Sequence, residues 1–209
     1  MARTLWKAKG RKLRTRLVGS SMPKRYGPWT QLRSKITYRN PWITIQEDAV
    51  IRPDGERGIY SFLQKPPGIF IVAFDGKGVY FLKQYRYALR RAILEIPAGI
   101  MQGKNLLQNA KRELFEETGI RAKTWKQLGQ YFIAPGHEQT KIYAYLATNL
   151  DVHDVTKARQ EGDESILDIV YVPLPKLRRM LSAGKVQCGI TLAALGLFFN
   201  HLALTKKRS

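Results

Sequence analysis

The segment from Leu106 to Gly119 constrains the fold more than any other part of the chain. Leu106, Ala110 and Leu114 recur at the spacing of helical turns, which predicts one apolar face. Gly119 follows at the position where a left-handed residue commonly ends a helix. The segment therefore predicts a helix over residues 106–118 that packs one face against a hydrophobic core.

The same helix carries three glutamates within five residues, Glu113 to Glu117. Glu113 and Glu117 are four residues apart and share one face, with Glu116 beside them and Arg112 placed to orient one carboxylate. Crowded carboxylates repel one another unless a cation lies between them, and such oxygen ligands suit Mg²⁺ or Mn²⁺ rather than zinc. A solvated acidic patch is the alternative. The chain has only 16 acidic residues against 36 basic ones, so this concentration favours a metal site.

Short apolar segments on both sides of this helix predict strands, which makes the chain an α+β protein. The clearest pair is Ile69–Phe74 and Val79–Gln84, joined by the hairpin signal Asp75–Gly78. Further helices are expected over Pro175–Ala183 and Thr191–Leu204, and the apolar run in the last of these is too short to span a bilayer. Other expected strands are Trp42–Ile45, Ile59–Leu63, Ala92–Ile96, Trp125–Ile133, Ile142–Leu146 and Ile166–Val172.

Residues 112–120 resemble the end of the Nudix box, and Glu95-Ile96-Pro97-Ala98-Gly99 is similar to its opening in ADP-ribose pyrophosphatase-like members. The resemblance runs from about residue 38 to about residue 204. It includes four smaller motifs: Asn40-Pro41-Trp42, Pro53-Asp54-Gly55, Gln84-Tyr85-Arg86-Tyr87 and Pro135-Gly136. The chain is therefore identified as a member of the Nudix hydrolase family, ADP-ribose pyrophosphatase-like subgroup.

The resemblance implies the Nudix α/β/α sandwich with a mixed central sheet, and hydrolysis of the diphosphate bond in a nucleoside diphosphate compound. It implies Mg²⁺ as the cofactor, with Mn²⁺ as an alternative. Arg86 matches a substrate-contacting arginine of similar proteins, and members of this subgroup are commonly homodimers with exchanged N-terminal strands. The expected metal ligands are the backbone carbonyl of Ala98 and the side chains of Glu113, Glu117 and Glu164.

Three positions depart from the family pattern: Lys104, Thr140 and Gly162. Lys104 stands where the box has a glutamate that is not usually a primary ligand. Similar proteins often have an acid in place of Thr140, so Glu138 could substitute for it. Gly162 stands where similar enzymes have the glutamate that activates water. The remaining candidates for a general base are Glu116, Glu161 and Asp163.

Positive charge is concentrated at the N-terminus. Of the formal net charge of +20, twelve charges lie before Glu47, and no acidic residue precedes it. We expect a basic extension over residues 1–36 and the Nudix domain over residues 37–205. The extension could contact RNA, DNA or an anionic membrane, act as an organellar transit segment, or be a solvated tail. We expect a cytoplasmic protein, or one of an organellar matrix if the segment is a transit peptide.

The substrate expected first is ADP-ribose or a nucleotide sugar. A catalytically weakened Nudix domain that acts as a basic nucleic-acid-binding module is the alternative, favoured by Lys104, Gly162 and the net charge of +20. The intact Arg112-Glu113 and Glu116-Glu117 pairs argue against it, since a pure binding module has no need of an acidic cluster. An enzyme acting on RNA 5′ ends is a third possibility.

Overall fold

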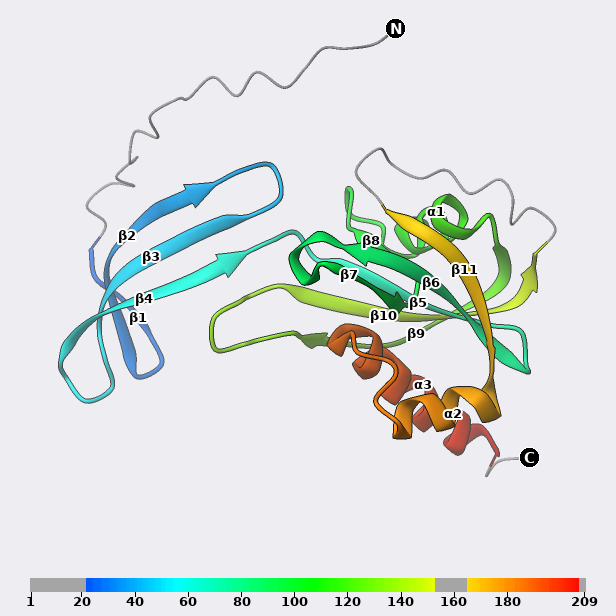
Figure 1. Cartoon of the computed structure of the whole chain (residues 1–209). Coiled ribbons are helices and arrows are strands. Elements are labelled where there is room, and N and C mark those ends of the chain that lie inside the picture. The colour runs from blue at the N-terminus through cyan, green and yellow to red at the C-terminus, as the bar shows by residue number, and fades with distance from the viewer. Residues whose placement is uncertain (1–21, 153–164, 207–209) are drawn as a thin grey trace, which may run out of the picture. The chain divides into compact units, whose positions relative to one another are not determined.

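The computed structural model describes residues 22–152 and 165–206 and divides the chain into two units between Lys65 and Pro66 (Figure 1). The first unit is an antiparallel four-stranded sheet in the order β1-β2-β3-β4. Its strands are β1 (Lys24–Tyr26), β2 (Trp29–Arg39), β3 (Thr44–Ile51) and β4 (Arg57–Gln64).

The second unit has a seven-stranded sheet. Five of its strands lie in the order β11-β6-β5-β10-β9, and the other two, β7 and β8, pair with β6 and β5. Strands β5 and β10 pair in parallel, whereas the other pairs are antiparallel, so the sheet is mixed. Its strands are β5 (Gly68–Phe74), β6 (Gly78–Arg86), β7 (Arg91–Glu95), β8 (Ala98–Ile100), β9 (Arg121–Phe132), β10 (Lys141–Asp151) and β11 (Ile166–Pro173). The helices are the 3-10 turn η1 (Tyr87–Leu89), α1 (Leu106–Thr118), α2 (Leu174–Ser182) and α3 (Gly189–Lys206).

Helices cover both faces of this sheet, with α1 on one face and α2 and α3 on the other (Figure 1). The alternation of side chains along β5 explains why two cores form. Ile69, Ile71 and Ala73 belong to the core under α1. Val72 and Phe74 belong to the core under α2 and α3. A strand buried on both faces requires a continuous apolar run, which is what residues 69–74 supply. The predicted α+β Nudix sandwich with a mixed central sheet is thus confirmed.

The predicted helix and hairpin lie where the sequence placed them. Helix α1 spans Leu106–Thr118, and Gly119 ends it in a left-handed conformation with φ of 70°. In the hairpin, the Asp75 carboxylate accepts the backbone N–H groups of Lys77 and Gly78, each at 2.8 Å. Gly76 has φ of 96°, a conformation that favours glycine.

The N-terminal boundary differs from the expected one. The expected boundary between residues 36 and 37 falls inside β2, which spans Trp29–Arg39, and the chain divides instead between Lys65 and Pro66. Two side chains of β2 contact β3: Lys35 forms an ion pair with Glu47 at 2.6 Å, and Gln31 donates to Asp48 at 2.6 Å. Such cross-strand pairs are not visible in the local pattern of β2 itself. Strand β8, which no segment of the sequence predicted, is held by pairing with β5.

Helix α3 is the buried C-terminal helix expected from the apolar run. Phe198 is fully buried, and its ring meets that of Phe74 edge-on at 5.1 Å. Within residues 22–152 and 165–206, no helix is both long and apolar enough to cross a membrane.

We predict that Phe198→Ala lowers the free energy of unfolding by about 3–5 kcal/mol, because it removes a ring from a closed core. Leu204→Ala on the same helix is the matched control, since Leu204 is 55% exposed. Urea unfolding followed by tryptophan fluorescence measures both. Equal losses for the two variants would contradict the packing of α3.

Candidate active site

Helix α1 presents its carboxylates to the interior of the second unit. Asn105 caps its start by accepting the Gln108 N–H at 3.0 Å, and Gly119 closes its end. Packing of Ala110 and Leu114 against β5 fixes the rotation of the helix about its axis. Glu113 and Glu117 are then only 7% and 3% exposed. Two buried carboxylates on one face are costly unless polar partners compensate them.

The segment that enters β8 supplies such partners. The backbone N–H of Ala98 donates to Glu117 Oε2 at 2.7 Å. At Gly99, an added Cβ would lie 1.9 Å from the carboxyl carbon of Glu113. A side chain at this position would have to displace the Glu113 carboxylate, which occupies that space. These contacts bring together three of the predicted metal ligands: Ala98, Glu113 and Glu117.

Arg112 connects Glu116, the third glutamate of α1, to Glu113. Its guanidinium donates to Glu113 and, at 2.6 Å, to Glu116 Oε2. Burial lowers the pKa of Arg112, but the charges of Glu113 and Glu116 outweigh burial and raise it above the ordinary value. Arg112 therefore stays a cation and orients two carboxylates, where the sequence predicted that it would orient one.

The donor set fits a divalent cation. Among the residues that the structure describes, no three Asp, Glu, His or Cys side chains form a ready-made metal group, and Arg112 contacts two of the carboxylates. Yet the space at Gly99 is kept for Glu113, and Glu113 and Glu117 are buried oxygen donors on one helix face. Carboxylate and carbonyl oxygens are the ligands that Mg²⁺ and Mn²⁺ take.

Arg86, the predicted substrate contact, ends β6 and pairs with Glu95. Arg86 Nε donates to Glu95 Oε2 at 2.7 Å. The sequence included Glu95 in the box motif but gave it no role. A single charged residue in the apolar run Ala92–Ile96 was the signal that could have identified it.

Three predicted residues lie outside the described part of the chain: Glu161, Asp163 and Glu164. Their roles stay predictions, as does the consequence of Gly162. Of the other departures from the family pattern, Lys104 is exposed ahead of α1, and Thr140 is 3% exposed. The Thr140 hydroxyl has no hydrogen-bond partner among the described residues.

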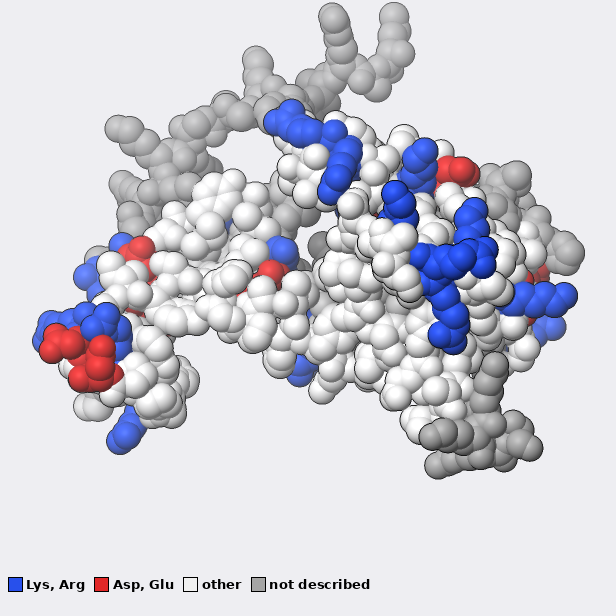
Figure 2. Space-filling view, turned by 60° about the horizontal axis from the view of Figure 1, so that its bottom comes forward, with Lys and Arg blue, Asp and Glu red and all other residues white. Residues whose placement is uncertain are grey.

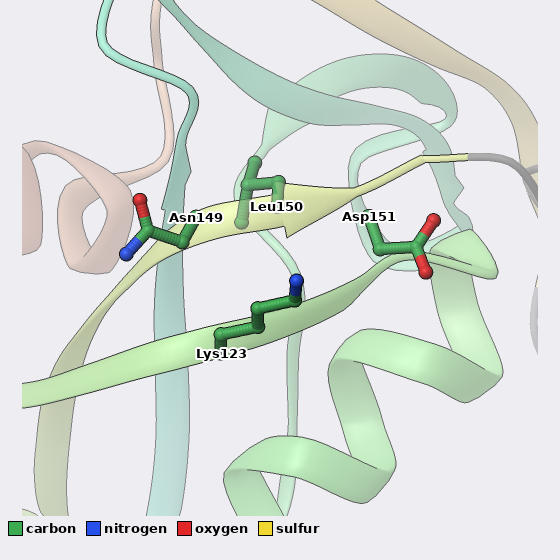
Figure 3. Close-up of a pocket in the computed structure, with 4 residues that line it drawn as sticks. All are labelled: Lys123, Asn149, Leu150 and Asp151. Atoms are coloured by element: carbon green, nitrogen blue, oxygen red, sulfur yellow. The ribbon is translucent and has the colours of Figure 1, made fainter.

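A hollow of about 570 Å³ opens elsewhere in the second unit, at the paired ends of β9 and β10 (Figure 3). Its lining residues are Lys123, Asn149, Leu150 and Asp151. Asn149 has φ of 53° and donates to the Thr124 hydroxyl at 2.8 Å. None of the predicted site residues lines this hollow. The candidate active site is therefore identified by the carboxylates of α1 and not by the hollow.

Lys and Arg side chains gather over the second unit on the face that Figure 2 shows. Helix α2 alone contributes three exposed basic residues, Lys176, Arg178 and Arg179, and no acidic one. The excess of positive charge therefore extends beyond the N-terminal segment.

A mixed sheet between two helical layers, with buried carboxylates on the helix that follows β8, defines an α/β/α sandwich with a carboxylate site. The NUDIX domain matches residues 64–188, and the nucleoside diphosphate sugar hydrolase N-terminal domain matches residues 29–63. The chain belongs to the Nudix family. The predicted membership is confirmed, and the protein is a pyrophosphatase that hydrolyses the diphosphate bond of a nucleoside diphosphate compound.

Relatives with established names support the same class. The chain is 27% identical over 167 residues to an ADP-ribose pyrophosphatase of Mycobacterium tuberculosis (strain ATCC 25618 / H37Rv), covering 78% of this chain and 80% of that protein. It is 26% identical over 155 residues to an ADP-ribose pyrophosphatase of Bacillus subtilis (strain 168), covering 73% and 83%. A crystal structure described as an ADP compounds hydrolase has the same fold, with a TM-score of 0.75 and 22% identity over 87% of this chain and 98% of that one.

We predict that Gly99→Ala abolishes activity, because the new methyl group displaces the Glu113 carboxylate. Overpacking of this kind also costs about 1–3 kcal/mol of stability. Gly196→Ala is the control: a Cβ there meets nothing within 4 Å, and alanine favours a helix. Steady-state rates over a Mg²⁺ titration, with thermal unfolding, measure both. An active Gly99→Ala enzyme would show that activity does not require the Glu113 carboxylate in its present position.

Proposed function

We propose that the enzyme hydrolyses ADP-ribose or a nucleotide sugar, with Mg²⁺ as its cofactor and Mn²⁺ as an alternative. The observation that carries the proposal is the burial of Glu113 and Glu117 on one face of α1, against a glycine that leaves room for a carboxylate. The names of the relatives, two of them ADP-ribose pyrophosphatases, and the nucleoside diphosphate sugar hydrolase N-terminal domain support this substrate class.

The residues of the chain have separate roles in this proposal. Glu113, Glu117 and the Ala98 carbonyl would hold the cation, with Glu164 as a further ligand. When bound, the cation neutralises charge on the diphosphate oxygens and helps ionise the attacking water. Arg112 keeps Glu113 and Glu116 in place. Arg86 binds a phosphate oxygen through its guanidinium.

The proposed general base is Glu116, Glu161 or Asp163. The position of Glu116 favours it as the general base, because it lies on α1 next to the buried carboxylates and its side chain is 33% exposed. A base must reach a water molecule, and partial exposure permits that.

A catalytically weakened, nucleic-acid-binding Nudix domain is the second candidate. The basic surface in Figure 2 and the twelve basic residues before Glu47 favour it. A screen of nucleoside diphosphate compounds with Mg²⁺, reading released phosphomonoesters, separates the two. Turnover of ADP-ribose or a nucleotide sugar supports the enzyme, whereas salt-dependent RNA binding without turnover supports the module.

We also propose that the protein is a homodimer in the cytoplasm. The homodimer follows from the subgroup to which the chain is similar. Sedimentation of the purified protein tests the dimer, and fractionation of cells tests the location.

We predict that Glu117→Gln lowers kcat/KM by about two orders of magnitude, since losing a ligand charge removes about 3 kcal/mol of transition-state stabilisation. The loss should be largest at limiting Mg²⁺, and the fold should stay intact because the amide oxygen of the new side chain can still accept the Ala98 N–H. Glu56→Gln, an exposed carboxylate in the first unit, is the control. Near-wild-type rates for Glu117→Gln at limiting Mg²⁺ would exclude Glu117 as a ligand.

We predict that one of Glu161→Gln and Asp163→Asn lowers kcat at saturating Mg²⁺, because a positioned base contributes roughly 10²–10⁴-fold. Gly162→Glu should raise kcat if that position still reaches the water. Pre-steady-state and steady-state rates measure all three variants. If all match the wild type, Glu116 is the base that remains.

A further inference from the structure

Glu95 is a buried carboxylate for which the family resemblance gave no role. It ends β7, where its Cα pairs with that of Leu82 on β6, and it is 7% exposed. Burying a charge is costly unless the charge is paired and hydrogen-bonded. Its environment should therefore contain dedicated partners.

Two side chains provide them. Arg86 Nε donates to Glu95 Oε2 at 2.7 Å, and the thiol of Cys188 lies close enough to the same carboxylate to interact with it electrostatically. Burial raises the pKa of the Cys188 thiol, hydrogen bonding with Thr191 opposes this, and the Glu95 charge adds to the increase. The next residue, Ile96, donates its N–H to the Thr191 hydroxyl on α3 at 3.3 Å. Cys188 and Thr191, around the start of α3, therefore hold Glu95 and its neighbour Ile96 on the side away from solvent.

Arg86 uses only part of its guanidinium in this pair. Its side chain is 45% exposed, and among the described residues only Nε makes a hydrogen bond. The two terminal nitrogens, which carry four N–H donors, face no described protein acceptor. A guanidinium held by Nε is oriented, and its terminal nitrogens suit two oxygens of a phosphate group.

The pair lies within reach of the carboxylate site. Ala98, which contacts Glu117 at 2.7 Å, is three residues after Glu95, a span of at most about 11 Å. The short segment between β7 and β8 therefore has the Arg86–Glu95 pair at one end and the Glu117 contact at the other.

We propose that Glu95 is a positioning residue: it holds Arg86 by Nε so that the terminal nitrogens bind the diphosphate of the substrate. This inference rests on the proposed function. Glu95 acts through Arg86 and does not touch the substrate. The bond is charge-assisted on both sides, roughly twice as strong as a neutral hydrogen bond, so its loss should free the Arg86 side chain.

The test is calorimetric binding of ADP-ribose to the full-length protein in EDTA, where no turnover occurs. Glu95→Gln should raise Kd about tenfold, the consequence of losing one charge-assisted contact. Arg86→Lys should raise it similarly, because Lys lacks Nε and the planar fork. Glu95→Asp should recover part of the affinity. The double variant should bind no more weakly than Arg86→Lys alone, since Glu95 acts only through Arg86.

Three controls separate positioning from stability. Asp54→Asn breaks another Arg–carboxylate pair, Arg52–Asp54 at 2.9 Å, and should leave Kd unchanged. Thermal unfolding shows whether Glu95→Gln is folded, and Glu95→Asp keeps the test decisive if it is not. With Mg²⁺, Glu95→Gln should raise KM more than it lowers kcat, and the Mg²⁺ midpoint should not move. A purely structural role would lower the unfolding midpoint and kcat while leaving KM and Kd as in the wild type.

Inorganic pyrophosphate is the second probe, because it carries the diphosphate without a nucleoside. If the wild type fails to hydrolyse ADP-ribose but the variants keep their ranking with pyrophosphate, the substrate proposal fails and the positioning role stands. The positioning role is overturned if Glu95→Gln binds both probes like the wild type, if the effects of the two substitutions add, or if neither probe binds the wild type.

Discussion

The site depends on the close contact between α1 and the segment that enters β8. Glu113 fills the space that a side chain at position 99 would need, and Glu117 accepts the N–H of Ala98. The contact is possible because β8 pairs with β5 while α1 packs on the same strand through Ala110 and Leu114. Strand β5 thus positions both α1 and β8. A shift of either one would separate the carboxylates of α1 from the segment that enters β8.

Buried charge is the second constraint, and the two arginines of the site satisfy it in different ways. Arg112 holds two carboxylates of its own helix, so its guanidinium belongs to the carboxylate cluster. Arg86 is half-exposed and gives one nitrogen to a buried carboxylate from another strand. A buried ion pair contributes little net stability, because desolvation offsets the attraction. The Arg86–Glu95 pair is therefore better explained by orientation of a surface group than by stability of the fold.

Sequence reasoning succeeded where the signal was local. The apolar stripe and Gly119 predicted α1 to the residue, and the Asp75–Gly78 turn predicted its hairpin. Reasoning failed for β2, because the strand is held by pairing with β1 and β3 rather than by a pattern within its own residues. The role of Glu95 was missed for the same reason. Its partners lie nine residues earlier and, at Cys188, far later in the chain.

The sequence by itself determined the family, the reaction class and the carboxylate helix, because periodicity, helix capping and the box motif involve residues close together in the chain. It also determined which residue types could hold a cation. Only the tertiary structure decided that Glu113 lies against Gly99, that Arg112 bridges two carboxylates, and that Arg86 is held by Glu95. These contacts join separate elements, and the packing of β5, β6 and α1 sets distances that no local pattern encodes.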